Sequence, residues 1–244
     1  MWFNGLLFSL GLLICSFSYA QKTLVFSAVE GTFISDINEV IIRDAYKRLG
    51  IDIVIKRSPA ARALQQSNSG IYDGELFRIA NIHKKYPNLV MTPVVLYEVE
   101  VRVYSKNQNF KVQGWGSLSP YKIGIERGVQ FSLQGTKGMR RQIFNSAQQL
   151  FKVLAKDRVD IVVADVWSAL GAQHALHQTG FFLKGIKALS PNLMVIQLHH
   201  YLHNKHLALV PKVNQAIKEA LKAGVAKKAE SQILKQYALP KPVL

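Results

Sequence analysis

The fold is decided by two apolar stretches near the start of the chain, Thr23-Leu-Val-Phe-Ser-Ala-Val29 and Ile51-Asp-Ile-Val-Ile-Lys56. Both are short and rich in Val, Ile and other apolar residues, which is typical of buried strands. Between them apolar residues recur at every fourth position from Ile37 to Leu49, and this spacing predicts a helix that ends at Gly50. A strand, a helix and a second strand in this order predict an α/β fold with a mainly parallel sheet.

The same alternation continues along the chain and then restarts, which predicts two halves. In the first half we expect a helix from Pro59 to about Gln66, a strand at Tyr72–Ile79, and one or two strands in Leu89–Tyr104. In the second half we expect strands at Tyr121–Glu126, Arg140–Phe144 and Val159–Ala164, with helices at Ala147–Ala155 and from about Val166 to His177. Two extended segments, Glu98–Tyr104 and Leu193–His199, are candidate crossings between the halves. A two-lobed body of this kind binds small ligands between its lobes, at the carboxyl ends of parallel strands.

The N-terminal segment has the composition of a secretory signal peptide. Residues 1–20 contain no Asp, Glu, Lys or Arg, and an apolar run from Leu6 to Phe17 leads to the small residues of a cleavage site. The alternative is an uncleaved anchor, but the run is short for a membrane-spanning helix, which needs about 20 apolar residues. A branched residue before Cys15 disfavours a lipoprotein signal. We therefore expect an exported, periplasmic protein that is cleaved after Ala20.

The composition describes a folded and strongly basic protein. Of 244 residues, 49% are hydrophobic and 19% are charged, so the chain can bury a sizeable core and is not disordered. A single cysteine excludes a disulfide scaffold and a cysteine-rich zinc module. The excess of 31 Lys and Arg over 15 Asp and Glu gives a net charge of +16. Taken alone, this charge suggests nucleic acid, a membrane surface or an acidic small molecule as a partner.

We interpret most of this positive charge as solvated surface. An exported protein rarely meets a genome, and the basic segments lack the interleaved aromatic residues that stack on bases, so we expect no nucleic acid partner. Half of the surplus lies between Lys184 and Leu244, where there are ten Lys and two acidic residues. In Pro211–Ala223 apolar residues recur at every fourth position, which leaves the lysines on the solvent side of a helix.

Motifs of enzymes, metal centres and nucleotide sites are absent from the sequence. There is no HExxH, GxSxG, P-loop or GxGxxG pattern. Four of the seven histidines form a cluster at His199, His200, His203 and His206, but the nearest acidic residue in the sequence is far away. We expect this cluster to supply polar residues at a lobe crossing. We therefore expect no metal, no cofactor and no catalytic residue.

Charged residues stand where the predicted strands end. The residues that share this position are Glu30, Glu75, Arg78, Glu126, Arg127 and Asp165. If each strand directs its carboxyl end at the space between the lobes, these groups converge there. An arginine provides a planar fork for a carboxylate, and an acidic residue holds an ammonium group, so together they form a dipolar site for an amino-acid-like solute. The alternative for each residue is a surface ion pair or a helix cap.

Several motifs in order resemble a known family. In the first half they are Tyr46-Lys-Arg-Leu-Gly50-Ile51, Ser58-Pro-Ala-Ala-Arg62-Ala-Leu64 and Ser69-Gly70-Ile-Tyr-Asp73-Gly74. In the second half they are Tyr121-Lys-Ile-Gly-Ile125 with Gly128, and Gln149-Leu150 followed by Val159-Asp160-Ile-Val-Val-Ala-Asp165. The order and spacing of these motifs, over nearly the whole chain after residue 20, resemble a divergent family 3 extracellular solute-binding protein. Such proteins capture polar amino acids in the periplasm for ABC transporters.

The resemblance implies a fold and its division into lobes. The expected fold is α/β and two-lobed, of the periplasmic-binding-protein-like type II, in which each lobe is a mixed, mainly parallel sheet flanked by helices. Residues 1–20 are the signal peptide, residues 21–104 with 200–244 form lobe one, and residues 105–199 form lobe two. The lobes are expected to close on a ligand about a hinge.

The resemblance also assigns ligand-binding residues, with departures from the family pattern. Asp165 matches the acidic residue that receives the ligand's α-ammonium group. The usual T-x-E-R segment, whose Arg grips the α-carboxylate, is absent, so Arg78, or Lys84 or Lys85, takes that role. The hydroxyl residue that normally follows the first strand of lobe two is replaced by Val129. The ligand-binding candidates are Arg78 and Asp165 as anchors, then Glu75, Glu30, Arg62 and Arg127, with Phe33 and Trp167 stacking on the ligand.

The sequence therefore predicts a monomeric periplasmic solute-binding protein that encloses a small polar ligand and performs no chemistry. The expected partners are that ligand and an inner-membrane ABC permease, or a sensor. One alternative is an orphan sensory or accessory module with the same ligand site. The other is an enzyme of the dehydratase type on this fold, with Glu75 and Glu126 or a histidine as acid and base.

Overall fold

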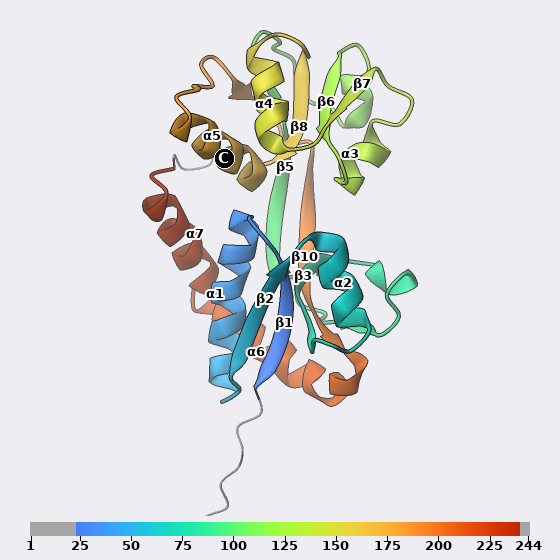
Figure 1. Ribbon diagram of the computed structural model, residues 1–244, viewed down its shortest axis with the longest axis vertical. Helices are drawn as coiled ribbons and strands as arrows, with labels where there is room; N and C mark the ends of the chain where they lie inside the picture. The colour runs from blue at the N-terminus through green and yellow to red at the C-terminus, as the bar shows by residue number, and fades with distance from the viewer. Residues whose placement is uncertain (1–22, 240–244) are drawn as a thin grey trace, which may run out of the picture.

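Two long antiparallel strands, β5 (Tyr97–Ser105) and β10 (Met194–His203), run from one half of the molecule into the other (Figure 1). The structure is a computed structural model and describes residues 23–239. The two strands pair with each other from Tyr97 opposite Leu198 to Val101 opposite Met194. They contain both segments that the sequence predicts as crossings, so the lobes are joined by paired strands.

The lower lobe in Figure 1, lobe one, is a mixed sheet in which β1 is parallel to β2 and β3, while β10 is antiparallel to β3. Its strands besides β10 are β1 (Leu24–Val29), β2 (Ile53–Ser58), β3 (Gly74–Ile79) and β4 (Leu89–Met91). Its helices are α1 (Phe33–Arg48), α2 (Ala60–Asn68), α6 (Val210–Lys222) and α7 (Val225–Gln236), with short 3-10 turns at Ile82–Lys84 and Asn204–Leu209. Helices α1, α6 and α7 lie on one side of the sheet and α2 lies on the other.

The upper lobe, lobe two, repeats this plan. Strand β6 is parallel to β7 and β8, while β8 is antiparallel to β5. Its strands besides β5 are β6 (Ile123–Glu126), β7 (Arg141–Phe144), β8 (Ile161–Asp165) and β9 (Lys187–Ala188). Its helices are α3 (Gln130–Gly135), α4 (Ala147–Ala155) and α5 (Val166–Gln178), with a 3-10 turn at Trp115–Leu118. The α/β class and the two lobes are as the sequence predicts. The pairing is mixed rather than mainly parallel, because four strand pairs among residues 23–239 are parallel and five, all of which involve β5 or β10, are antiparallel.

Local sequence explains where the principal helices begin. Thr32 caps α1 by accepting a hydrogen bond from the backbone N–H of Ser35, and Ser146 caps α4 in the same way through Gln149. Helix α2 begins directly after Pro59, which has no N–H to leave unpaired. The starts of α2 and α4 lie within one residue of the predicted ones, whereas α1 begins at Phe33, before the predicted apolar pattern that starts at Ile37. The short helix α3 is not predicted, because its six residues offer neither a side-chain cap nor a repeated apolar period.

The core of lobe one contains a buried, hydrogen-bonded histidine. His200 is fully buried, and its Nδ1 and Nε2 lie 3.0 Å from the carbonyl oxygen of Leu76 and the hydroxyl of Tyr46. Burial lowers the pKa of His200 to about 4, so the ring is neutral at physiological pH. Gly74 is required beside it, because a Cβ there would lie 2.1 Å from the backbone oxygen of Tyr201. This packing fixes β3 against β10.

Two predictions extend beyond what the structure tests. The signal peptide and Cys15 fall in residues 1–22, outside the described residues. Among residues 23–239, no helix is long and apolar enough to cross a bilayer. The limits of the lobes, 21–104 with 200–244 and 105–199, also stay a prediction. The structure shows only that the chain passes between the lobes within β5 and β10. Strand β10 pairs with β3 of lobe one, β5 pairs with β8 of lobe two, and the two strands pair with each other.

Candidate functional site

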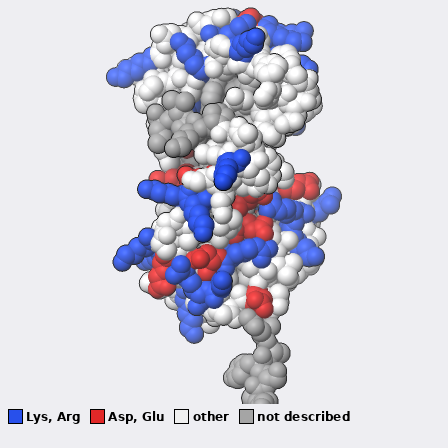
Figure 2. All heavy atoms as spheres, turned by 90° about the vertical axis from the view of Figure 1, so that its left-hand side faces the viewer, with Lys and Arg blue, Asp and Glu red and all other residues white. Residues whose placement is uncertain are grey.

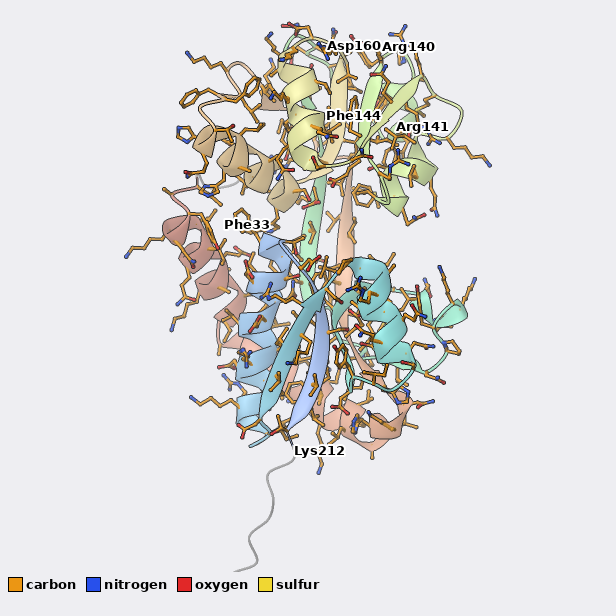
Figure 3. All side chains as sticks on the ribbon, in the orientation of Figure 1. Phe33, Arg140, Arg141, Phe144, Asp160 and Lys212 are labelled. Atoms are coloured by element: carbon orange, nitrogen blue, oxygen red, sulfur yellow. The ribbon has the colours of Figure 1, made fainter. Side chains whose placement is uncertain are left out.

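The parallel strands of both lobes direct their carboxyl ends at the junction between the lobes (Figure 1). In lobe one, the chain leaves the end of β1 and enters α1 at Phe33, which Figure 3 shows at the junction. In lobe two, β6, β7 and β8 lead into α3, α4 and α5. Binding sites of α/β proteins form at such ends, so the charged residues there are the candidate site.

On the lobe-one side, Arg78 is held in one orientation. Its Nε donates a hydrogen bond of 3.0 Å to Oε2 of Glu75, and its Nη2 donates one of 3.2 Å to the carbonyl oxygen of Ala60 at the start of α2. Glu75 is fully buried and the side chain of Arg78 is 12% exposed. The pKa of Glu75 is raised by burial, and the charge and hydrogen bond of Arg78 oppose that rise. The two sequence-predicted residues are therefore brought together as a charge-balanced pair.

On the lobe-two side, two carboxylates lie close together. Asp165 ends β8 and caps α5, where it accepts a hydrogen bond of 2.9 Å from the backbone N–H of Ser168. Glu126 ends the neighbouring strand β6, and the backbone N–H of Ala147, at the start of α4, bonds to it. The pKa of Glu126 is raised first by burial and then by the negative charge of Asp165. Among residues 23–239, neither carboxylate forms an ion pair.

The negative charge of Asp165 also affects a side chain on the polar face of β5. Burial and the charge of Asp165 both raise the pKa of the Tyr104 hydroxyl, while Arg102 opposes this effect. Arg102 donates from both Nε and Nη2 to Oε2 of Glu100, at 2.9 and 2.6 Å. These three side chains line a cavity of about 600 Å³ that also reaches Val166 of α5 and the loop before β10. A cavity of this size suits a small molecule, but Arg78, Glu126 and Asp165 are not among the residues that line it.

The remaining sequence-predicted residues are more dispersed. Phe33 packs on Tyr237 of α7, with 4.8 Å between the ring centroids. Glu30 and Arg62 are exposed at the end of β1 and on α2. Arg127 is exposed, and its Nε donates to Asn145 at 2.9 Å, on the β7 side of the lobe. The two lysines that were alternatives to Arg78, Lys84 and Lys85, are exposed as well.

Trp167 forms part of a hydrogen-bonded connection between the lobes. Its side chain is 5% exposed, and its Nε1 donates a hydrogen bond of 3.0 Å to the hydroxyl of Tyr97 on β5. That hydroxyl donates in turn to Oε1 of Glu230 on α7, at 2.8 Å. A helix of lobe two, a crossing strand and a helix of lobe one are thus joined by two successive hydrogen bonds. This chain of contacts restrains how the lobes sit relative to each other.

The histidine cluster lies on β10 and in the turn that follows it. Nδ1 of His199 lies 3.1 Å from the carbonyl oxygen of Thr92, and His206 lies 2.6 Å from Oδ1 of Asp73. A register irregularity between His199 and Tyr201 interrupts the simple alternation of faces expected for a strand. In residues 23–239 no three His, Cys, Asp or Glu side chains are grouped as a metal site. His199, His200 and His206 are buried in the protein interior, whereas His203 is only partly buried and accepts a hydrogen bond from the backbone N–H of Lys205.

Sequence reasoning missed the polar face of β5. The signal was available in Tyr97–Ser105, where Glu98, Glu100, Arg102 and Tyr104 alternate with buried residues. Alternation of this kind places all four side chains on one face of the strand. From the sequence we interpret this stretch only as a connection between the lobes, so the polar face of the strand is missing from the candidate site. The sequence also favoured Arg127 over Glu126, although it is Glu126 whose pKa responds to Asp165.

Comparisons with known proteins define the fold. No protein family model matches the chain. A protein of Shewanella oneidensis described as uncharacterized is 26% identical over 200 residues, which cover 80% of this chain and 74% of that protein. An ancestral arginine-binding protein bound to glutamine is a structural neighbour with a TM-score of 0.62 and 20% identity, over 86% of this chain and 96% of the other.

Two further solved structures show the same architecture. An amino acid ABC transporter substrate-binding protein from Streptococcus pneumoniae, bound to L-arginine, has a TM-score of 0.65 and 13% identity, over 88% of this chain and 95% of the other. A histidine kinase sensor domain with similarity to periplasmic binding proteins has a TM-score of 0.66 and 11% identity, over 87% and 96%. These three neighbours are binding proteins or a sensor domain. The chain has the two-lobed type II fold of periplasmic binding proteins.

Proposed function

We propose that the protein is a periplasmic solute-binding protein that holds a small polar, amino-acid-like ligand at the junction of its lobes and delivers it to an ABC permease. The observation that carries this proposal is the pair Glu126 and Asp165, two carboxylates at the ends of adjacent strands with no ion-pair partner among residues 23–239. The shared fold and the substrate-binding proteins among its neighbours support it.

The charges suggest what the ligand carries. Asp165 and Glu126 would receive a cationic group, because uncompensated carboxylates are stabilised by a nearby positive charge. Arg78, whose Nη1 has no recorded partner in the described chain, would receive a carboxylate from the lobe-one side. Its own charge is balanced by Glu75, so the junction as a whole is negative. We therefore infer a ligand with net positive charge, such as a basic amino acid.

The other predicted residues have secondary roles in this proposal. Glu30, Arg62 and Arg127 are exposed near strand or helix ends, where closure of the lobes would bring them toward the ligand. Phe33 and Trp167 would shape the wall of the site next to α5 and α7. The lobes would close about β5 and β10, with limits near residues 104 and 199. Export through the N-terminal segment would place the protein in the periplasm.

The test is calorimetric titration with basic, neutral and acidic amino acids, diamines and organic acids. We expect a basic ligand to bind, and Asp165→Asn or Arg78→Ala to lower its affinity at least about tenfold, as expected for a lost charge-assisted contact. Glu219→Gln, an exposed residue of α6, is the control and should leave the affinity unchanged. If no ligand binds, or if all three variants bind like the wild type, the site is wrongly assigned.

A sensory role is the second candidate, because one neighbour is a sensor domain. Uptake of the identified ligand distinguishes the two. Cells that lack the protein should lose high-affinity uptake if it serves a permease. Unchanged uptake with a lost transcriptional response to the ligand would favour the sensor.

A further inference from the structure

The far end of lobe two gathers basic residues from several loops. Strands β6, β7 and β8 begin at this end, and β5, which is antiparallel to β8, finishes there. The pairing of Ser105 with Ile161 and of Ile123 with Arg141 puts these strand ends side by side. Figure 3 shows Arg140 and Asp160 at the top of lobe two, away from the junction. The loops at this end therefore form one surface opposite the candidate ligand site.

We call this the distal basic surface. Its basic members are Lys106, Lys122, Arg140, Lys156, Arg158 and Lys184. Lys184 belongs to it because the neighbouring Gly185 faces Lys106, and a Cβ on that glycine would lie 3.8 Å from Cγ of Lys106. Lys156 belongs to it as the residue that caps the C-terminus of α4. The acidic residues in these loops are Asp157 and Asp160, so the surface carries four more positive than negative charges.

Two of the six basic residues are paired. Nζ of Lys106 lies 2.7 Å from Oδ2 of Asp157, and that contact lowers the pKa of the aspartate. Nη2 of Arg140 lies 3.4 Å from Oδ2 of Asp160, with 69% of the arginine side chain exposed. Within residues 23–239, the other four form no ion pair. Figure 2 shows the upper lobe with blue side chains along its top and little red, whereas both colours are interspersed on the lower lobe.

Most arginines of lobe one form ion pairs, although Arg62 forms none with residues 23–239. Arg43 and Arg48 pair with Glu39 and Asp44 one helical turn away, and Arg57 pairs with Asp36 at 2.9 Å. Basic residues that remain unpaired together on one surface favour an anionic partner. The basic residues come from several separate loops, and none of them lines the cavity beside β5, so we expect this partner to be an extended surface.

The chemistry of the surface favours phospholipid over nucleic acid. Single-stranded nucleic acid needs aromatic side chains on which bases stack. Tyr121, next to Lys122, is stacked on Phe110 at 4.5 Å and packs in the core of lobe two, so it is not available for bases. Lysines and arginines near a bilayer bind anionic headgroups without any aromatic platform.

We propose that the distal basic surface binds the anionic headgroups of a phospholipid bilayer. Contact at this end leaves the junction of the lobes open, so membrane attachment and ligand capture are compatible. The inference is independent of the ligand that the junction takes. Because the attraction is electrostatic, it weakens as salt shortens the screening length.

The experiment measures cosedimentation with vesicles of phosphatidylglycerol and phosphatidylcholine, compared with vesicles of phosphatidylcholine alone. The distal variant is Lys156→Gln, Arg158→Gln and Lys184→Gln, which breaks no recorded ion pair. The matched control is Lys218→Gln, Lys222→Gln and Lys227→Gln on α6 and α7, where the residues are also exposed. Both variants lose three positive charges, so net charge is held equal and only position differs.

We expect the wild type to bind anionic vesicles in low salt and not neutral ones. Each basic residue near an anionic bilayer raises the affinity roughly fivefold. The distal variant should therefore bind anionic vesicles at least about tenfold more weakly than the wild type, and the control variant less than about threefold more weakly. The proposal is overturned if the two variants lose affinity equally, if the distal variant binds like the wild type, or if duplex DNA is bound in preference to anionic vesicles. Circular dichroism of each variant confirms that it is folded.

Discussion

The two sides of the lobe junction differ in how their charges are compensated. In lobe one, Arg78 and Glu75 form a buried pair at 3.0 Å, and the arginine is further held by the carbonyl oxygen of Ala60. In lobe two, Asp165 and Glu126 are each bound by backbone N–H groups, but no positive side chain within residues 23–239 pairs with them. The charges on the lobe-one side are paired with each other, while the lobe-two carboxylates have no paired positive charge among the described residues.

This difference explains how a strongly basic protein can present a negative site. The net charge of +16 is carried by the surface, including the distal basic surface, whereas Asp165 and Glu126 at the junction form no ion pair with residues 23–239. In the proposed site, lobe one would provide an arginine held in one orientation, and lobe two would provide the attraction for a cation. The predictions that follow change one side at a time.

The largest effect is expected for the lobe-one pair. Glu75→Ala leaves the mostly buried Arg78 without its counter-charge, so we expect the free energy of unfolding to fall by about 3 kcal/mol, measured by urea denaturation. The double variant Glu75→Leu with Arg78→Met removes both charges and should recover most of that loss.

The control for this prediction is Glu39→Ala, which removes a partly exposed partner of Arg43 and Arg57 and should cost less than about 1 kcal/mol. Equal losses for Glu75→Ala and Glu39→Ala would show that burial of the lobe-one pair has no special effect.

An intermediate effect is expected at the cap of α5. Asp165→Ala removes the acceptor for the backbone N–H of Ser168 and should lower the free energy of unfolding by about 1 kcal/mol. Asp165→Asn keeps an acceptor and should be close to neutral, because Asn caps helices as well as Asp does. Ser146→Ala, at the cap of α4, provides the comparison for a cap without a ligand role. A large loss of stability for Asp165→Asn would mean that its charge, not its hydrogen bonds, holds the helix.

The smallest effect is expected for Glu126→Gln, and its sign is opposite. The pKa of Glu126 is raised in the folded protein, so ionisation of this group costs stability as the pH rises through that pKa. Removing the charge should raise the free energy of unfolding at neutral pH by less than about 1 kcal/mol. This gain is measured as a slightly higher melting temperature. In acid, where the carboxyl is protonated, the variant and the wild type should melt alike. A lower melting temperature at neutral pH would show that the carboxylate is compensated after all.

Most of the fold could be predicted from the sequence because its signals are local. Each of these signals depends on only a few neighbouring residues. They are the apolar run before Glu30, the apolar residues at every fourth position before Gly50, and the serine that caps α4. The prediction for α4, Ala147–Ala155, agrees with the structure at both ends. Strand β10 extends to His203, beyond the predicted extended segment that ends at His199, because pairing with β3 and β4 stabilises residues that have no strong strand pattern of their own.

The candidate site could be predicted only in part, because it depends on contacts that are distant in sequence. Glu75 and Arg78 are three residues apart on β3, a spacing that places side chains on opposite faces of a regular strand, so their contact does not follow from the sequence pattern. The position of Arg78 also depends on its hydrogen bond to Ala60 of α2. The effect of Asp165 on Glu126 depends on the register of two strands that are nearly forty residues apart. The hydrogen bond between Trp167 and Tyr97 crosses from one lobe to the hinge strand, and no local pattern indicates it.

The central claim, that lobe two supplies uncompensated negative charge to the ligand, is tested most directly by the affinity for a basic amino acid as a function of pH. Ionisation of Asp165 and Glu126, whose pKa values are raised from 3.8 and 4.5, strengthens the attraction for a cation. Calorimetry from about pH 4 to about pH 8 should therefore show affinity rising with pH, over a range above the ordinary titration of carboxyl groups. In Asp165→Asn with Glu126→Gln this rise should disappear. An affinity in the wild type that is constant or falls as the pH rises would contradict the account.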